Sequence, residues 1–151
     1  MEEVKREYYL GGQIKNESYY INGVHHREDE PAVIEYYQDG LIKREFYYQN
    51  GKIHRINGPA VIYYFSNGQI SIEEYYFNGV EHRVGKPAFT WYWNSGSVFQ
   101  EEYWVNGKIH KTNGPAQIYY NKDGTVQNEK YYINGTYYDD IFLYSVVAGS
   151  C

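Results

Sequence analysis

Cysteine and proline are scarce in this sequence, long apolar runs are missing, and each shortage narrows what the chain can be. Of 151 residues one is cysteine, Cys151, so no disulfide can form within the chain. No stretch approaches the roughly 18 consecutive apolar residues that a membrane-spanning helix needs, and residues 1–7 lack the apolar core of a signal peptide. We therefore expect an intracellular protein without a signal peptide or a transmembrane segment.

Several chemical signatures are missing as well. The formal net charge is −5, and the two signs are interspersed without long runs of either, which argues against nucleic acid as a partner. There is no glycine-rich phosphate loop, no nucleophile–base motif and no cysteine–histidine spacing typical of zinc sites. The sequence thus predicts no catalytic residue, no metal site and no cofactor.

Tyrosine and a strict repeat are what the chain has in excess. Its 21 tyrosines help to bring the aromatic fraction to 20%, and aromatic residues favour the pleated, half-buried surface of a β-sheet. Asn-Gly recurs every 28 residues, and so do all four prolines, each followed by alanine. Asn-Gly favours two-residue hairpin turns, because both residues tolerate a positive φ. The predicted structural turns are Asn22-Gly23, Asn50-Gly51, Asn78-Gly79, Asn106-Gly107 and Asn134-Gly135.

One repeat can be followed from residue 41 to residue 68. Residues 41–49 are expected to form a strand, and Asn50-Gly51 turns the chain back through residues 52–55. A bend follows at Pro59, which cannot donate to a central ladder, and residues 60–66 form the return strand to a second turn of the same expected type, Asn67-Gly68. The predicted fold class is all-β, an antiparallel meander of β-hairpin repeats with a 28-residue period in an elongated single sheet.

The repeat fills residues 1–140, as about five units of which the first and the last are partial. Residues 141–151 depart from the pattern and form the most apolar segment. Two interpretations of this tail stay open. It caps the last repeat, which has no neighbour to cover its edge, or it packs on a second copy of the chain through side chains such as Phe142 and Leu143.

Three polar columns recur with the repeat. They are Glu17, Glu45, Glu73, Glu101 and Glu129; Tyr19, Tyr47, Tyr75, Tyr103 and Tyr131; and His26, His54, His82 and His110. If Asn50-Gly51 is a two-residue loop, Tyr47 lies opposite His54 on the face of Glu45, and the three should form a hydrogen-bonded strip. Such groups can act in acid–base chemistry or bind metal, but their repetition in every unit favours a structural role. His25, off this lattice, is expected to be an exposed strand residue.

Large aromatic residues outside the columns concentrate in one part of the chain. Trp91 and Trp93 lie in one predicted strand and Trp104 in the next. Because aromatic residues are enriched at binding hot spots, these three form a candidate interaction surface. The alternative is that the large rings only cover a sheet that has a single layer.

The pattern Tyr-Tyr-x-Asn-Gly-x-x-His-Arg-x-x-Gly-Pro-Ala-x-Ile-x-Tyr, seen over residues 47–64, resembles a divergent MORN (membrane occupation and recognition nexus) repeat. The resemblance covers about residues 4–140 and rests on the step from Tyr48 to Gly51, on Gly58 and on Tyr63 and Tyr64. The period is longer than is usual in the family, and the Gly-Pro-Ala segment is an addition. Arrays of this kind are similar to those of large DNA viruses that infect amoebae. The resemblance implies a scaffold, in host cytoplasm or a virion, for protein contacts, dimerisation or lipid association.

Two functions of different classes remain open. The first is a non-enzymatic structural or scaffold protein that mediates contacts with an unidentified protein partner or self-association, for example as a homodimer. The second is an aromatic-ladder binding module for carbohydrate or choline-type ligands, because the Tyr-Tyr-x-Asn-Gly steps also resemble choline- and glucan-binding repeats, whose rings hold cations or stack on sugars. An enzyme is not expected.

Overall fold

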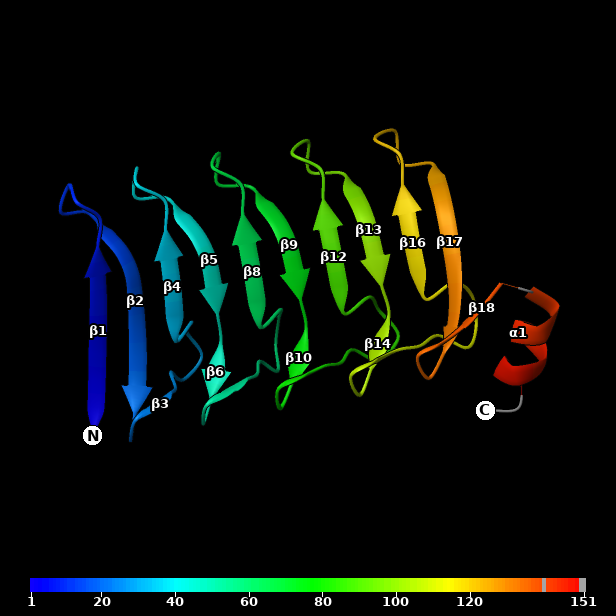
Figure 1. The fold of residues 1–151 in the computed structure, drawn as a ribbon, viewed down its shortest axis with the longest axis horizontal. Coiled ribbons are helices and arrows are strands. Elements are labelled where there is room, and N and C mark those ends of the chain that lie inside the picture. The colour runs from blue at the N-terminus through cyan, green and yellow to red at the C-terminus, as the bar shows by residue number, and fades with distance from the viewer. Residues whose placement is uncertain (140, 150–151) are drawn as a thin grey trace. The chain divides into compact units, whose positions relative to one another are not determined.

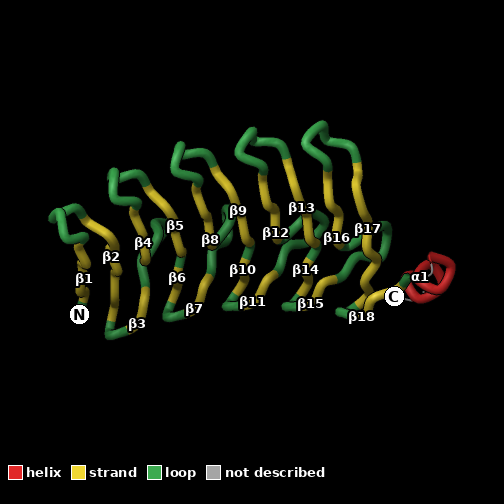
Figure 2. Tube along the Cα trace, turned by 45° about the horizontal axis from the view of Figure 1, so that its top comes forward, coloured by secondary structure: helices red, strands yellow, loops and turns green. Residues whose placement is uncertain are grey.

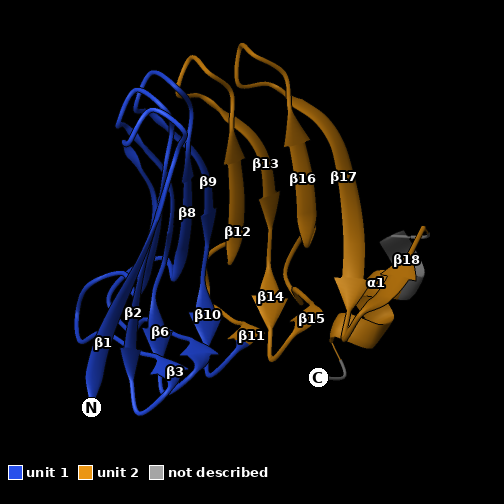
Figure 3. Cartoon of the chain, turned by 60° about the vertical axis from the view of Figure 1, so that its left-hand side comes forward, with its two compact units in different colours: residues 1–79 blue, residues 80–151 orange. Residues whose placement is uncertain are grey.

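The computed structural model describes residues 1–139 and 141–149, and the side chains of residues 141–143 lie outside that description. Its regular structure is almost entirely β-strand, with one helix near the C-terminus (Figure 1). Loops and turns connect the strands at both of their ends (Figure 2). The chain divides into two compact units, Met1–Gly79 and Val80–Cys151 (Figure 3). This division falls at the Asn78-Gly79 turn, within the stretch that the repeat pattern treats as one array.

Unit 1 is an antiparallel meander, with its longer strands in the order β1-β2-β4-β5-β8-β9. These strands are β1 Glu2–Tyr8, β2 Ile14–Ile21, β4 Val33–Tyr36, β5 Ile42–Phe46, β8 Val61–Tyr64 and β9 Ile70–Glu74. Two-residue strands beside the Asn-Gly turns are β3 Val24–His25, β6 Tyr48–Gln49, β7 Lys52–Ile53 and β10 Tyr76–Phe77. The strand expected over residues 41–49 is therefore interrupted at Tyr47.

Unit 2 has the same meander, in the order β12-β13-β16-β17-β18. Its longer strands are β12 Phe89–Tyr92, β13 Val98–Glu102, β16 Gln117–Tyr120, β17 Val126–Ile133 and β18 Thr136–Tyr138. Its short strands are β11 Val80–Glu81, β14 Trp104–Val105 and β15 Lys108–Ile109, and its helix is α1 Ile141–Ala148. Both units thus have the all-β, antiparallel hairpin architecture that the 28-residue pattern predicts. We call each 28-residue repeat a row.

The five Asn-Gly pairs form tight hairpin turns in which both residues have a positive φ. The asparagines have φ between 50° and 52°, and Gly51, for example, has φ 76°. In the row of Asn50, Gln49 pairs with Lys52 and Tyr48 with Ile53, which leaves a two-residue loop. Positive φ at both positions is the mark of the type I′ turn, whose twist matches that of the flanking strands.

The second set of turns differs from the type I′ geometry that we expected. In the turn after β8, Gly68 has φ 83°, but Asn67 is not among the residues with positive φ. The Gly68 N–H donates to the Phe65 carbonyl at 2.9 Å and the Phe65 N–H to the Gln69 carbonyl at 2.8 Å. These bonds define a three-residue loop, a type I turn closed by a left-handed glycine. The Asn67 Oδ1 accepts the Gln69 N–H at 3.0 Å, and this local bond favours the type I form.

The segment between each Asn-Gly hairpin and the next long strand leaves the sheet and covers one of its faces. The Tyr47 N–H donates to the Ala60 carbonyl and the His54 N–H to the Tyr47 carbonyl, so residues 55–59 form an excursion from the ladder. Arg55 of this excursion lies over the Tyr47 ring, 3.7 Å from its centroid. Side chains alternate along a strand, so one face lies under these excursions and the other does not. We call them the loop face, which carries Glu45, Tyr47 and Tyr64 and their equivalents 28 residues apart, and the open face, which carries the alternate positions.

The core is thin and lies beneath the excursions. The alanine that follows each proline is exposed by 1% or less in all four rows: Ala32, Ala60, Ala88 and Ala116. In unit 1 Tyr47, Ala60 and Ile62 form a buried cluster, and Ile53 and Tyr64 pack against it. On the open face Val61 is also almost completely buried, at 2% exposure. A single sheet with one covered face can bury only small or flat side chains in this way.

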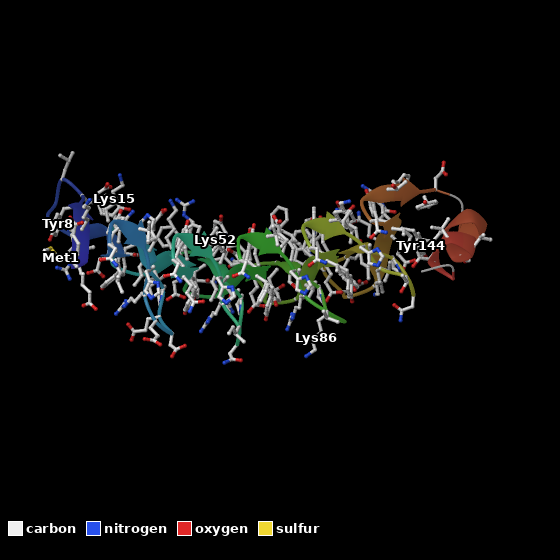
Figure 4. All side chains as sticks on the ribbon, turned by 90° about the horizontal axis from the view of Figure 1, so that it is seen from below. Met1, Tyr8, Lys15, Lys52, Lys86 and Tyr144 are labelled. Carbon is white, nitrogen blue, oxygen red and sulfur yellow. The ribbon has the colours of Figure 1, made fainter. Side chains whose placement is uncertain are left out.

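Helix α1 packs on β17 and β18 at the end of unit 2. Tyr144, labelled beside α1 in Figure 4, is 5% exposed, and its ring meets the Tyr131 ring at a centroid distance of 4.9 Å. Its hydroxyl lies 2.6 Å from the Lys111 carbonyl oxygen and accepts the Gly114 N–H at 3.0 Å. These contacts give α1 a local role against the last excursion. The predicted contact residues Phe142 and Leu143 lie outside the side chains that the structure describes.

Candidate functional site

The histidine column fastens each row to the turn of the next row. The Nδ1 atom of His54 accepts the backbone N–H of Asn78 at 3.0 Å, and the Gly79 N–H donates to the Ile53 carbonyl at 2.8 Å. The same side-chain bond joins His26 to Asn50, His82 to Asn106 and His110 to Asn134. Because Nδ1 accepts a hydrogen bond from a backbone N–H in all four histidines of the column, that nitrogen is not available to bind a metal ion or to take a proton from a substrate.

The basic residue after each histidine closes the excursion. Besides lying over the Tyr47 ring, Arg55 donates from Nη1 to the Pro59 carbonyl at 3.2 Å. Equivalent stacks place Arg27 3.9 Å from the Tyr19 centroid and Lys111 3.6 Å from the Tyr103 centroid. A cation over an aromatic ring is attracted by the negative charge of the ring face. The His-Arg pair of the repeat therefore has a structural role: the histidine bonds to the turn of the next row, and the arginine holds the excursion of its own row.

In the last row the glutamate column has the partner that we expected, since the Tyr131 hydroxyl donates to the Glu129 carboxylate at 3.0 Å, but in three other rows its partner is a different tyrosine. Tyr47 does lie opposite His54, but the Glu45 carboxylate accepts the Tyr64 hydroxyl at 2.7 Å. Glu45 pairs with Ile62 across the sheet, so Tyr64, two residues further on, is within its reach. The same bond joins Tyr36 to Glu17 and Tyr120 to Glu101. Burial, and then this carboxylate, raise the pKa of each of these three tyrosines well above its usual range.

These contacts decide what the loop face can do chemically. The carboxylate, imidazole and guanidinium groups are used to hold backbone and side chains of neighbouring rows. Among the residues that the structure describes, no group of three or more His, Cys, Asp or Glu side chains is placed to hold a metal ion. A hollow of about 190 Å³ in unit 1 is lined by Tyr47, His54 and Arg55 among other residues. These three residues already make the contacts between neighbouring segments that are described above. The loop face therefore resembles a framework more than a reaction site.

The open face of unit 2 carries a cluster of aromatic rings. Phe99 lies at its centre, with its ring centroid 4.8 Å from that of Trp91, 4.6 Å from that of Trp93 and 6.0 Å from that of Tyr119, all edge-to-face. Trp91 remains 42% exposed. β12 and β13 are out of register by one residue between Trp91 and Tyr92, and Phe99 is the extra residue of this bulge. The structure thus brings two of the three predicted tryptophans together around a residue that sequence reasoning missed.

The third predicted tryptophan, Trp104, joins a polar network beside this cluster. Its Nε1 donates to Oε2 of Glu102 at 2.8 Å, while the side-chain amides of Gln100 and Gln117 both donate to Oε1 at 2.6 Å. Gln100 is 8% and Gln117 9% exposed. Three N–H donors therefore fix one carboxylate on the open face, next to the rings. Tyr119 lies opposite Gln100 on the neighbouring strand, and burial followed by the Glu102 charge raises its pKa.

Two lysines lie against the same rings. The Nζ atom of Lys122 is 5.3 Å from the Trp93 centroid, and that of Lys130 is 5.5 Å from the Tyr119 centroid. The Nε1 atom of Trp93 is buried and makes no hydrogen bond within the described part of the chain. The surface formed by Trp91, Phe99, Tyr119, Glu102 and Trp104, with Trp93 and the two glutamines beneath them, is the candidate site, and we call it the unit 2 aromatic surface.

The corresponding positions in unit 1 hold an ion pair instead. Glu35 stands where the later row has Trp91, and it accepts from Nε of Arg44, which stands in the place of Gln100, at 2.9 Å. The Arg44 guanidinium lies 5.7 Å from the Tyr63 centroid, and the Phe46 and Tyr63 rings meet edge-to-face at 6.2 Å. Between β4 and β5 the open face of unit 1 is thus covered by this charged pair.

His25 is half-buried, contrary to our expectation of an exposed residue. Its ring stacks on that of Tyr20 at a centroid distance of 4.4 Å and lies 5.0 Å from that of Tyr48. Its Nδ1 is buried without a hydrogen-bond partner in the described structure, and burial lowers its pKa. The ring of His25 fills the space that Ile53 and Ile109 occupy in other rows.

A signal for the missed residues is present in the repeat itself. The position of Phe99 holds Lys15, Lys43, Ser71 and Gln127 in the other rows, and that of Glu102 holds Ser18, Phe46, Glu74 and Lys130. Row-by-row comparison would therefore have marked both positions as variable. Their partners could not be deduced, because the bulge that turns Phe99 toward the tryptophans depends on strand register.

Comparison with protein-family models, with curated proteins and with solved structures finds no match for this chain. Among the described residues no helix has the length and apolar character needed to cross a membrane.

Proposed function

We propose that this chain is a MORN-like repeat protein that acts as a non-enzymatic scaffold and contacts protein partners, a second copy of itself among them. The observation that carries the proposal is the exposure of large apolar side chains on the excursions. Ile56 is 77% and Val84 78% exposed. The other two excursions carry Glu28 and Thr112 at this position. Apolar side chains on a well-fastened loop offer contact area to a protein partner at little cost in conformational freedom.

The edge strand of unit 1, β1, is unsuited to pairing with a strand of another chain, which favours association through the faces of the sheet. All seven residues of β1 are exposed, and five of them are charged. Charged edge strands oppose pairing with a strand from another chain. By its resemblance to viral arrays, the proposal places this scaffold in a host cell or a virion, as a homodimer or a larger assembly.

A test of self-association compares the full chain with loop variants by light scattering coupled to size exclusion. We expect a mass of at least two chains, which falls to that of one chain when Ile56→Glu and Val84→Glu are combined. Both side chains are exposed, so the double variant should fold normally. The control is Thr112→Glu, at the equivalent position of an excursion that is already polar. A single-chain mass for the parent at every concentration would contradict the proposal.

The unit 2 aromatic surface favours a second candidate function, that of a binding module for carbohydrate or choline-type ligands. Its exposed Trp91 is held edge-to-face against Phe99, so a large rigid ring is available at the surface. This function needs neither self-association nor the excursion loops.

A further inference from the structure

The unit 2 aromatic surface combines ring faces with a fixed set of polar atoms. β12, β13 and β16, which carry these residues, are neighbours in the meander (Figure 1). Trp91 is 42% exposed although Phe99 packs against it, and Tyr119 borders Phe99 on the other side. Held rings of this kind present a large contact area and lose little conformational entropy when a ligand binds. They suit a ligand that has a flat apolar side.

The polar atoms beside the rings have hydrogen-bonding capacity to spare. A carboxylate offers about four acceptor positions, and Glu102 uses three of them, for Gln100, Gln117 and Trp104. Each glutamine directs its amide nitrogen at the carboxylate, because its carbonyl oxygen would be repelled there. The remaining acceptor position of Oε2 and the second N–H of Gln100 can serve a ligand that carries both donors and acceptors, whereas the Gln117 side chain also bonds the Tyr119 hydroxyl. Hydroxyl groups have that dual character.

Charge narrows the ligand class further. The Glu102 carboxylate stands beside the rings and opposes a phosphate or another anion. The Lys122 and Lys130 ammonium groups lie 5.3 and 5.5 Å from the centroids of Trp93 and Tyr119, and they oppose a cation that would seek those same rings. A quaternary ammonium ligand such as choline is therefore disfavoured. A ligand without charge meets neither obstacle.

We propose that the unit 2 aromatic surface binds a neutral glycan, whose apolar sugar face stacks on Trp91 and whose hydroxyl groups bond to the Glu102 network. This inference rests on the second candidate function, ligand binding, and is independent of self-association. Unit 1 offers an internal control, since Glu35 and Arg44 form an ion pair at the positions of Trp91 and Gln100. The Glu35–Arg44 row of unit 1 should therefore not bind the glycan.

The test uses intrinsic tryptophan fluorescence of the full chain. All three tryptophans, Trp91, Trp93 and Trp104, belong to this surface, so the signal reports on it without labelling. The probes are the hexasaccharides of cellulose, starch, chitin and mannan, with phosphocholine, which carries a quaternary ammonium group and a phosphate, as the charged probe. We expect a saturable change in emission with at least one hexasaccharide and none with phosphocholine.

Matched variants locate the site. Tyr119→Ala and Glu102→Gln should each weaken binding about tenfold. Tyr63→Ala, at the position equivalent to Tyr119 two rows earlier, should leave binding unchanged. Because loss of tryptophan also changes the signal, Trp91→Ala is measured by retardation in a gel that contains the matching soluble polysaccharide. Melting curves of all variants show that each is folded.

Several results would overturn the inference. No response to any of the four hexasaccharides would remove it, and a response to phosphocholine alone would replace it with a choline-type site. Binding that survives both Trp91→Ala and Tyr119→Ala would place the ligand elsewhere. Loss of self-association, rather than of glycan binding, in Trp91→Ala would assign the surface to a second copy of the chain. The loop variants above test the scaffold function separately, so the two failures can be told apart.

Discussion

The two faces of each meander differ in how strictly their residues repeat. On the loop face the position of Tyr47 is tyrosine in every row, and that of Glu45 is always glutamate. On the open face the position of Phe46, between them in sequence, holds four different residue types in the five rows. The contacts explain the difference. A loop-face side chain binds one specific atom in the next row, as His54 binds the backbone N–H of Asn78, and a change of that side chain removes the bond.

The open face can vary because its neighbours repack around each substitution. In unit 1 Arg44 and Glu35 satisfy each other, whereas in unit 2 Gln100 turns to Glu102 along its own strand. Both solutions fit the same backbone. Repetition thus marks the residues that build the sheet, and variation marks the positions at which this chain can carry a specific function.

The largest expected effect comes from removing a buried ring of the loop face. Tyr47 is 8% exposed and lies under Arg55, so Tyr47→Ala leaves a cavity and an unstacked guanidinium. We expect the free energy of unfolding to fall by about 3 kcal/mol. Tyr63→Ala, on the half-buried open face, should cost about 1 kcal/mol. Urea unfolding followed by circular dichroism measures both values.

The difference between the two losses in free energy of unfolding tests whether the loop face contributes more to stability than the open face. Equal losses for Tyr47→Ala and Tyr63→Ala would mean that both faces contribute alike to stability. Tyr47→Phe serves as the control for the ring itself, because it keeps the stacking surface under Arg55 and should recover most of the lost stability.

Substitution of two histidines on opposite faces, His54 and His25, should change the free energy of unfolding in opposite directions. His54→Ala removes the acceptor for the Asn78 N–H and should lower the free energy of unfolding by about 1 kcal/mol. His25→Ile replaces a half-buried ring, whose Nδ1 has no hydrogen-bond partner in the described structure, with isoleucine, which the next row has at the equivalent position as Ile53. It should raise the free energy of unfolding by about 1 kcal/mol. Thermal melts at pH 7 compare the two variants with the parent.

The stability difference between His25→Ile and the parent should increase at acidic pH. Its folded-state pKa is lowered by burial, so the unfolded chain binds the proton more readily than the folded one. The parent should therefore lose this part of its stability as the pH falls below about 6.5, and the advantage of His25→Ile should grow. An advantage that is the same at pH 5 and pH 8 would show that the buried imidazole is not the cause.

The period alone was enough to predict the fold, because Asn-Gly, the prolines and the apolar alternation all specify local geometry. Turn type was predicted correctly for Asn50-Gly51 and wrongly for Asn67-Gly68, where a three-residue loop with a left-handed Gly68 connects the strands and the Asn67 Oδ1 accepts the Gln69 N–H. The unit 2 aromatic surface was predicted only through its tryptophans. Its Phe99 depends on a bulge, and its Glu102 on contacts between strands, and neither can be derived from one strand's sequence.

A last effect concerns the tyrosines that bond to the glutamate column, and it is specific to alkaline pH. Tyr64 donates to Glu45 at 2.7 Å, and burial together with this carboxylate raises its pKa well above the usual range. Above about pH 10 an unfolded tyrosine loses its proton while Tyr64 keeps it, so the folded state binds more protons and stability falls as the pH rises. Tyr36 and Tyr120 add to the same loss.

The substitution that isolates this effect is Tyr64→Phe. It should lower stability by about 1 kcal/mol at pH 7, because the Glu45 hydrogen bond is lost, and should make the fall above pH 10 less steep. Tyr63→Phe, the adjacent residue on the open face, serves as the control. Unfolding free energies measured from pH 7 to pH 11 decide the matter. A slope that Tyr64→Phe leaves unchanged would mean that the Glu–Tyr pairs of the loop face do not set the alkaline limit, and the distinction between the faces would then hold for packing alone.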